Sequence, residues 1–170
     1  MRSFFIAMYD IIYADPPWKY DFSASQSREI ENHYSTMSIE EICAFDFPRK
    51  RNSVLYLWAT APKIRLAFQV IDAWGYEYKT QAVWNKINFG MGYWFRGQHE
   101  ILLVATSGKF CPPFPEHRRR SIITAKRGKH SRKPEEVYKM IEESFPRAKK
   151  LELFARVRRD GWDARGKDLK

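Results

Sequence analysis

The chain reads Tyr9-Asp10-Ile11-Ile12-Tyr13-Ala14-Asp15-Pro16-Pro17-Trp18 near its start, an apolar run followed by an acidic residue, two prolines and a tryptophan. Such a run of Ile and Tyr is typical of a buried strand. Proline has no amide hydrogen for a sheet ladder, so we expect the strand to stop near Asp15. Because the Pro-Pro step fixes two φ angles, the carbonyls of this turn point in set directions. This stretch therefore predicts a strand that ends in a carboxylate, a rigid turn and an indole.

These groups could hold an exocyclic amine such as that of adenine. The lone pair of that amine is delocalised into the ring, so the nitrogen is a poor nucleophile until its hydrogens are drawn to acceptors. Asp15 and the carbonyl of Pro16 are such acceptors, and Pro17 would hold the turn. Trp18 offers a face on which a base taken out of its stack could lie. The alternative is purely structural, with Asp15 capping a turn and Trp18 in the core.

The length and the cysteines favour one intracellular domain. The chain has 170 residues, which fits a single domain spanning residues 1–170. Cys43 and Cys111 are far apart and form no Cys-x-x-Cys pair, so neither a disulfide framework nor a structural zinc is expected. No small-residue cleavage site follows the first apolar residues, and no apolar run approaches the ~20 residues of a membrane span. We expect a cytoplasmic protein without a membrane partner.

Positive charge is concentrated in a few places. The formal net charge is +10, and the largest basic cluster runs from Arg118 through Arg119 and Arg120 to Lys133. A polyanion such as nucleic acid is the natural partner of such a cluster. The alternative is a well-solvated basic surface that only aids solubility. Aromatic residues make up 16% of the chain, with six Trp, which supplies stacking surface as well as core.

Strand-like runs alternate with helical patterns along the chain, which favours an α/β sheet with helices on its faces. Further strands are expected at residues 53–58, 76–84, 100–106, 121–124 and 150–154, and helices at 38–45, 62–74 and 134–143. Ser38 and Glu41 match a capping box at the start of the first helix. The polar stretch at 22–33 has neither period, so we expect a mobile loop there that acts as a substrate lid.

Several polar or aromatic residues fall just past expected strand ends. They are Asp15, Trp58 to Thr60, Asn85 with Lys86, and Arg156. Ligands of open α/β sheets collect beyond the carboxyl ends of the strands, so one crevice could gather these residues. For Asn85 and Lys86 a substrate contact and a structural role are both open. For His99 and Glu100, at a strand start, a structural hydrogen bond is the expectation.

The order of these segments resembles the MT-A70-like family of adenine amino-methyltransferases, which includes the catalytic subunit of the eukaryotic mRNA adenosine methyltransferase and bacterial and phage DNA adenine methyltransferases. The matching stretches are residues 15–18, 34–38, 55–58, 74–76, 83–86, 130–134 and 152–156. Each stretch alone is weak, but this many in one order is a specific signal over residues 9–162.

The resemblance implies a Rossmann-like methyltransferase fold that binds S-adenosylmethionine, with a mostly parallel sheet and helices on both faces. It also implies a permuted order, in which the catalytic residues Asp15, Pro16, Pro17 and Trp18 precede the main cofactor strand. Lys133 would pair with the cofactor's carboxylate, although a basic residue at a helix start can also face solvent or a phosphate. The cofactor-binding residues that the resemblance implies are Asp15, Lys133, Glu152, Phe154, Arg156, Lys167 and Asp168.

The resulting hypothesis is metal-free transfer of a methyl group to the amino group of a flipped-out adenine. The substrate-binding residues expected are Trp18, His33, Tyr34, Asn85, Lys86, Arg118, Arg119 and Arg120. The three arginines would hold phosphates around the extruded nucleotide. DNA is favoured over RNA by analogy with compact bacterial and phage relatives. A partner subunit or second copy could complete the cofactor pocket, because few residues precede the first strand and Lys167-Asp168 departs from the usual pattern of relatives.

Two rival functions stay open at the level of sequence. The chain could be a non-catalytic nucleic-acid-binding subunit of a methyltransferase complex, although Asp15 and both prolines are intact. The same chemistry could also act on a small molecule or a protein amide, against which the basic clusters argue.

Overall fold

The computed structural model describes residues 8–20, 35–128 and 132–170 of the chain. Across these residues a seven-stranded sheet forms in the order β5-β3-β4-β2-β1-β6-β7. The strands are β1 (Ile11–Ala14), β2 (Ser53–Ala59), β3 (Glu77–Asn85), β4 (His99–Ser107), β5 (Ile122–Thr124), β6 (Lys150–Leu153) and β7 (Asp163–Arg165). The helices are α1 (Ile39–Cys43), α2 (Ile64–Ala73) and α3 (Glu135–Ser144), with short 3-10 turns η3 (Ala61–Lys63) and η4 (Pro115–His117).

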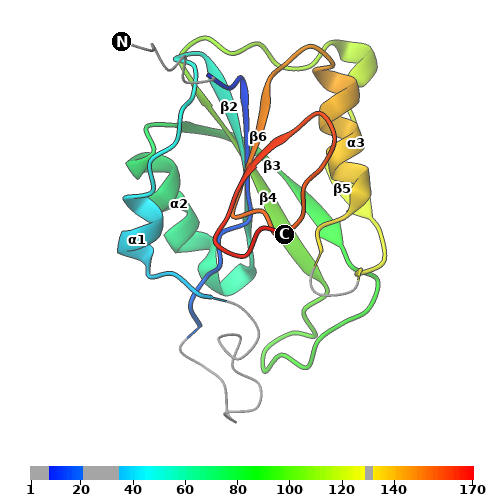
Figure 1. Cartoon of the computed structure of the whole chain (residues 1–170). Coiled ribbons are helices and arrows are strands. Elements are labelled where there is room, and N and C mark those ends of the chain that lie inside the picture. Colours follow the sequence, from blue (N-terminus) through cyan, green and yellow to red (C-terminus); the bar gives the residue numbers. More distant parts are fainter. Residues whose placement is uncertain (1–7, 21–34, 129–131) are drawn as a thin grey trace.

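The sheet is mostly parallel, with one strand reversed inside it. β1 pairs in parallel with β2 and β6, β6 with β7, and β3 with β5. β4 lies antiparallel between β2 and β3, because a hairpin joins β3 directly to β4. Helices α1 and α2 cover one face of the sheet and α3 covers the other (Figure 1). The predicted fold class, an α/β Rossmann-like sheet with helices on both faces, is confirmed.

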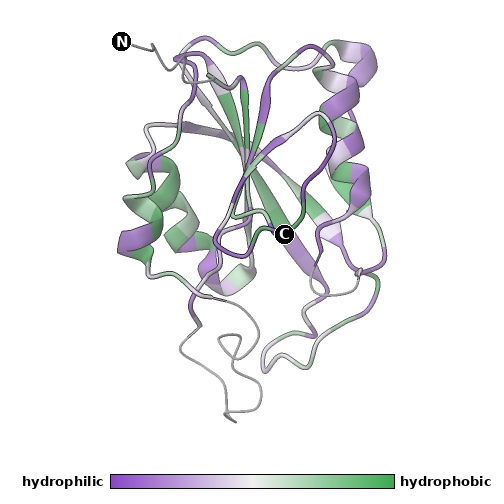
Figure 2. Ribbon diagram, viewed as in Figure 1, coloured by the Kyte–Doolittle hydropathy of each residue, from purple (hydrophilic) through white to green (hydrophobic). Residues whose placement is uncertain are grey.

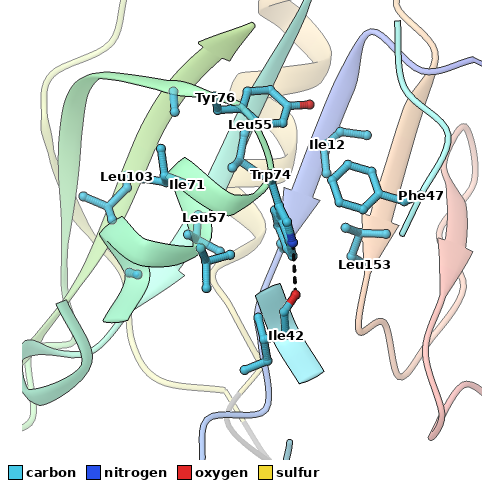
Figure 3. Close-up of a cluster of buried hydrophobic side chains, with 14 of the residues drawn as sticks. Ile12, Ile42, Phe47, Leu55, Leu57, Ile71, Trp74, Tyr76, Leu103 and Leu153 are labelled. Carbon is cyan, nitrogen blue, oxygen red and sulfur yellow. Dashed lines mark hydrogen bonds between the residues drawn. The ribbon is translucent and has the colours of Figure 1, made fainter. Parts of the chain in front are cut away.

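Each face of the sheet has its own hydrophobic core. Under α1 and α2, the Trp74 indole packs beside Ile42 and donates a 3.0 Å hydrogen bond from Nε1 to the Ile42 carbonyl (Figure 3). Under α3, Tyr138 and Trp162 pack against the opposite side of the central strands. The central strands are the most hydrophobic part of the ribbon, as their green colour in Figure 2 shows.

All predicted strands and helices exist, with shifted ends. β1 starts at Ile11 rather than at Tyr9, and the carboxylate of Asp10 before it binds the ammonium of Lys50 and the amide of Lys149. β7 was not predicted. Its three residues are too few to show a strand pattern, and pairing with β6 is what makes them a strand. The expected lid at residues 22–33 lies outside the described residues.

The position of β1 between β2 and β6 determines where its last residue lies in the sheet. All four residues of β1 are fully buried, and they align with residues 54–57 of β2 and 150–153 of β6. Asp15, the next residue, therefore emerges between the ends of these two strands. In the part of the chain that the structure describes, no helix is long and apolar enough to cross a bilayer.

Candidate active site

The turn after β1, residues 15–18, carries the predicted catalytic residues and is here called the catalytic turn. Its own backbone and the chain that leads into α1 hold it in place. The Pro16 carbonyl accepts a 2.8 Å hydrogen bond from the Trp18 amide, and the Pro17 carbonyl accepts one of 2.9 Å from the Met37 amide. The Trp18 indole is only 6% exposed and donates to the Trp58 carbonyl at 3.3 Å. Trp18 thus lies in the core, as its structural interpretation expects, and its stacking on a base stays a prediction.

Lys133 joins the catalytic turn to the start of β4. Its Nζ lies 2.9 Å from Oδ2 of Asp15 and 3.1 Å from Oε2 of Glu100. Lys86, just beyond β3, binds the other oxygen of Glu100 at 3.3 Å. The Lys133 side chain is 10% exposed, and its Nζ lies 5.5 Å from the ring centre of Trp58. Two carboxylates and two ammonium groups therefore form a continuous, largely buried chain of charges.

In this row of charges, the ion pairs shift the pKa values of Lys133 and Glu100 more strongly than burial does. Burial alone would lower the pKa of Lys133, but the charges of Asp15 and Glu100 outweigh it and raise the pKa. Burial alone would raise the pKa of Glu100, but Lys133 and Lys86 lower it. Both groups are consequently charged at neutral pH, and Lys133 holds one oxygen of Asp15 in a fixed position.

This geometry decides between the two expectations for Lys133 and adds Glu100 to the candidate site. The solvent-facing alternative for Lys133 is wrong, because its ammonium is enclosed by two carboxylates. Glu100 was expected to make only a structural hydrogen bond, and the structure instead links it to Asp15 through Lys133. A signal was available in the sequence, since Glu100 is a charge directly before the apolar residues of a buried strand. Its partner could not be read, because Lys133 is far away in the chain.

A second polar group lies beside Asp15 on the α3 face. Tyr138 donates from its hydroxyl to Oε1 of Glu152 at 2.9 Å, and Trp58 donates from Nε1 to the Tyr13 hydroxyl at 2.7 Å. Tyr13 and Glu152 are register partners on β1 and β6. Burial raises the pKa of Glu152 to about 7, although the bond from Tyr138 opposes this, and the charge of Asp15 raises the pKa further.

Phe154 directly follows β6 and has a rare backbone conformation. Its φ is 61°, in the left-handed region that bulky residues seldom adopt. Aromatic contacts hold it there, with the Phe45 ring centre at 4.9 Å and the Trp74 ring stacked at 6.4 Å. Such strain persists only where the surroundings fix it, and it is frequent at ligand sites.

The segments after β6 and β7 run in close contact. The Ala155 amide donates to the Arg165 carbonyl at 3.0 Å, and a Cβ on Gly166 would lie only 2.1 Å from the Ala155 carbonyl oxygen. Only glycine fits this approach. Arg156 and Lys167, which follow these two points of contact, therefore belong to adjacent segments at one end of the sheet.

Asp168 connects this region to the catalytic turn. Its Oδ1 lies 3.5 Å from the Ser35 hydroxyl, a long hydrogen bond. Two residues later, Met37 donates to the Pro17 carbonyl. The structure thus gathers Asp15 and the segment after β6, as predicted from their strand ends, and adds the segment after β7. Cofactor binding by these residues stays a prediction.

The Asn85 side chain stabilises the β3–β4 hairpin. Its Oδ1 accepts hydrogen bonds of 3.0 Å from the Ile87 amide and from Nε2 of Gln98, which closes the base of the β3–β4 hairpin. His33 and Tyr34, the other predicted substrate contacts of this kind, lie outside the described residues.

Arg118, Arg119 and Arg120 lie away from the catalytic turn. They precede β5, the edge strand four strands from β1, which is about 19 Å at ~4.8 Å per strand. Arg119 pairs with Glu143 at the far end of α3, and Arg118 donates to the Pro113 carbonyl at 3.2 Å. The three arginines therefore lie at the opposite end of the sheet from the catalytic turn, and phosphate binding by them stays a prediction. The basic residues at the same end as the catalytic turn follow β5.

The described ranges contain no cluster of three or more His, Cys, Asp or Glu side chains placed to hold a metal ion.

Comparison with known proteins gives one consistent result. The family model described as MT-A70 matches residues 9–168. The chain is 34% identical to the Type II methyltransferase M.MunI of Mycoplasma sp, a match that covers 95% of this chain and 78% of that protein. It is 30% identical to the N(6)-adenosine-methyltransferase MT-A70-like protein of Arabidopsis thaliana, covering 99% of this chain and 25% of the relative. The human N(6)-adenosine-methyltransferase catalytic subunit METTL3 is 28% identical, with 89% of this chain and 26% of METTL3 covered.

Proposed function

Because the chain belongs to the MT-A70 family, we propose that it transfers a methyl group to the exocyclic amino group of adenine in nucleic acid. The observation that carries the proposal is the intact Asp15-Pro16-Pro17-Trp18 turn at the end of the central strand, where buried Lys133 orients Asp15 at 2.9 Å. The names of the relatives support adenine N6 as the target, as N(6)-adenosine methylation is what several of them are named for.

Asp15 and the Pro16 carbonyl act as acceptors for the two amino hydrogens. Lys133 occupies Oδ2 of Asp15, so Oδ1 accepts one hydrogen. The Pro16 carbonyl already accepts the Trp18 amide, and its second lone pair accepts the other hydrogen. Drawing both hydrogens away directs the nitrogen lone pair toward the methyl donor. Alignment of this kind can save ~7–11 kcal/mol of a barrier.

The residues at this end of the sheet fit S-adenosylmethionine as the donor. Its sulfonium is a cation, and Glu152 near the end of β6 supplies a carboxylate in addition to Asp15 and Glu100, whose charges Lys133 and Lys86 balance. When bound, this cofactor supplies an activated methyl group, whose transfer removes the sulfonium charge and is favoured where water is scarce. The residues that would hold it are Phe154, Arg156, Lys167 and Asp168, together with Asp15.

Glu100 and Lys133 are positioning residues in this mechanism. Lys133 fixes the Asp15 carboxylate, and Glu100 fixes Lys133 at 3.1 Å. Asp15 need not remove a proton before transfer, because the amino proton leaves readily once nitrogen becomes positively charged.

DNA is the proposed polymer, and the extent of the match supports it. The chain covers 78% of the Type II methyltransferase but only about a quarter of the adenosine methyltransferases. It spans a small part of those larger relatives, so their partners do not carry over. A second copy or a partner subunit that completes the cofactor site is part of the proposal.

The test is methyl transfer from radiolabelled S-adenosylmethionine to duplex DNA, single-stranded DNA and RNA of one adenine-containing sequence. We expect transfer by the wild type, most rapidly to DNA, and a loss on the order of 10²- to 10³-fold in Asp15→Asn. Asp72→Asn, an exposed change on α2, is the matched control and should leave the rate unchanged.

Two results would contradict the proposal. Transfer to none of the three polymers by the folded wild type would favour a non-catalytic nucleic-acid-binding subunit. Undiminished transfer by Asp15→Asn would show that the chemistry lies elsewhere. Faster transfer to RNA would overturn only the choice of polymer.

A further inference from the structure

The hairpin between β3 and β4 displays aromatic side chains to solvent. Residues 87–98, here called the aromatic loop, read Ile-Asn-Phe-Gly-Met-Gly-Tyr-Trp-Phe-Arg-Gly-Gln. Tyr93, Trp94 and Phe95 are 99%, 93% and 85% exposed, and Phe89 and Met91 are also exposed. Large apolar side chains gathered on a surface in this way mark an interaction site.

The aromatic loop is a built structure. The Gly90 amide donates to the Gly97 carbonyl at 2.8 Å, which continues the hairpin beyond the sheet. Arg96 reaches back from Nη1 to the Gly92 carbonyl at 3.2 Å. A Cβ on Gly92 would lie 2.3 Å from the Phe95 carbonyl oxygen, so the backbone turns too tightly there for any other residue. The loop therefore presents its aromatic rings from a backbone that is already folded.

The aromatic loop is attached to the catalytic turn through charges. It begins one residue after Lys86, which binds Glu100 at 3.3 Å. Glu100 shares Lys133 with Asp15, at 3.1 and 2.9 Å. In Figure 1 the loop and the end of β1 leave the same end of the sheet. β3 is three strands from β1, about 14 Å at ~4.8 Å per strand, so a nucleic acid held at Asp15 can reach this loop with the nucleotides that flank the target.

We propose that the aromatic loop is a stacking platform for the unpaired bases that flank the target adenine. This inference rests on the proposed function. Base stacking on aromatic side chains suits any sequence, because every base has a π face. A flipped adenine leaves neighbouring bases partly unstacked, and an exposed Tyr-Trp-Phe run can cover them.

Charge favours nucleic acid over a protein partner at this surface. The aromatic loop contains Arg96 and no acidic residue. Lys126 follows β5 at the same end of the sheet, where the Ala125 amide donates to the Asn85 carbonyl at 3.2 Å, and Arg132 adjoins Lys133. Aromatic rings with nearby cations are what single-stranded nucleic-acid sites use.

The experiment measures binding of a fluorescein-labelled 20-nucleotide single-stranded DNA to the full chain at low and high salt. Trp94→Ala and Tyr93→Ala should each weaken binding roughly 5- to 150-fold, the effect of one lost stacked base. The loss should persist at high salt, because stacking is not screened as phosphate contacts are. Trp94→Phe should retain most of the affinity. Phe114→Ala is the matched control, since this ring is 69% exposed but lies before η4, close to Arg118.

Wild-type affinity in both alanine variants would overturn the inference. So would a change in oligomeric state without a change in DNA affinity, measured by sedimentation, because the surface would then serve a second copy of the chain. Loop-dependent binding without methyl transfer would support the platform and reject the proposed function. Methyl transfer by the wild type, together with unaltered DNA binding by the variants, would support the proposed function and reject the platform.

Discussion

Lys133 is the residue whose environment is most demanding. An ammonium group at 10% exposure is costly to remove from water, and it is tolerated because two carboxylates lie within 3.1 Å of it. Removing one charged side chain of this group leaves a buried charge without its partner. Removing two side chains of opposite charge leaves the net charge of the group unchanged. The energetic importance of Lys133 is therefore inseparable from Asp15 and Glu100.

This coupling can be measured by a double-mutant cycle. Lys133→Met should lower the free energy of unfolding by about 3–5 kcal/mol, because Asp15 and Glu100 are left without their shared cation. Glu100→Gln should cost less, since Asp15 still pairs with Lys133. The double variant should cost about 1–3 kcal/mol less than the sum of the two changes. Urea unfolding of the four proteins gives the cycle, and strictly additive costs would show that the ion pairs contribute no coupling.

Glu152 predicts a pH dependence of stability. Its pKa is about 7 in the folded protein against a usual 4.5, so between these values the folded state binds more protons than the unfolded state. Stability from this group is therefore present below pH 4.5 and is lost as pH rises to 7. Glu152→Gln mimics the neutral form and should be more stable than the wild type by roughly 3 kcal/mol at pH 8, with little difference at pH 4.5.

Urea unfolding of both proteins at the two pH values tests this. Glu136→Gln, on the exposed side of α3, is the control for loss of one carboxylate. A stability difference that is the same at both pH values would contradict the raised pKa of Glu152.

At the scale of elements, the short helix α1 begins beside the catalytic turn and helps to hold it. It has only five residues, and its capping box holds it together: Ser38 accepts from the Glu41 amide at 3.2 Å, and Glu41 accepts from the Ser38 amide at 2.8 Å. Met37, directly before this cap, binds the Pro17 carbonyl. The cap therefore fixes both the helix and one side of the catalytic turn.

Removing the cap should affect stability and turnover together. Ser38→Ala should lower the free energy of unfolding by about 1 kcal/mol and reduce kcat, because the turn loses part of its support. Ser38→Asp retains the cap and should retain most of both. Urea unfolding and steady-state methyl transfer measure the two effects. An aspartate variant no better than the alanine variant would mean that the cap does not support the turn.

The sequence predicted this cap because a capping box is a local pattern, and it predicted the strands because their apolar runs are continuous. Other features were not readable for stated physical reasons. β7 is a strand because β6 offers it hydrogen bonds, and its three residues are too few to show a strand pattern in the sequence. The Lys133 bridge joins residues far apart in the chain, which no local pattern reveals. The arginines at 118–120 were recognised as basic, but composition does not tell at which end of a sheet a charge lies.

At the scale of the whole molecule, the excess positive charge is divided between two ends of the sheet. Lys126 and Arg132 lie at the end that carries the catalytic turn, and Arg118 and Arg120 lie on the edge strand's far side. All four side chains are exposed, so changes at either pair remove two surface charges without disturbing the core. The two pairs separate the effect of position from the effect of net charge.

Position should decide affinity for nucleic acid. Lys126→Gln with Arg132→Gln should weaken binding and reduce the slope of log K against log salt by about 2, if each cation neutralises one phosphate. Arg118→Gln with Arg120→Gln removes the same charge and should change the slope much less. Fluorescence anisotropy over a series of KCl concentrations measures both slopes. Equal losses from the two pairs would show that only net charge matters.

The pairing of β1 with both β2 and β6 also has a consequence for synthesis. Ile11 aligns with Lys150, so β1 completes its hydrogen bonds only with a strand that is synthesised much later in the chain. Until β6 leaves the ribosome, β1 is an open edge, the kind of strand that invites pairing with other chains. Asp15 is thus synthesised well before the strand that fixes its position. The predicted catalytic turn of a nascent chain is complete only after β6 has joined the sheet.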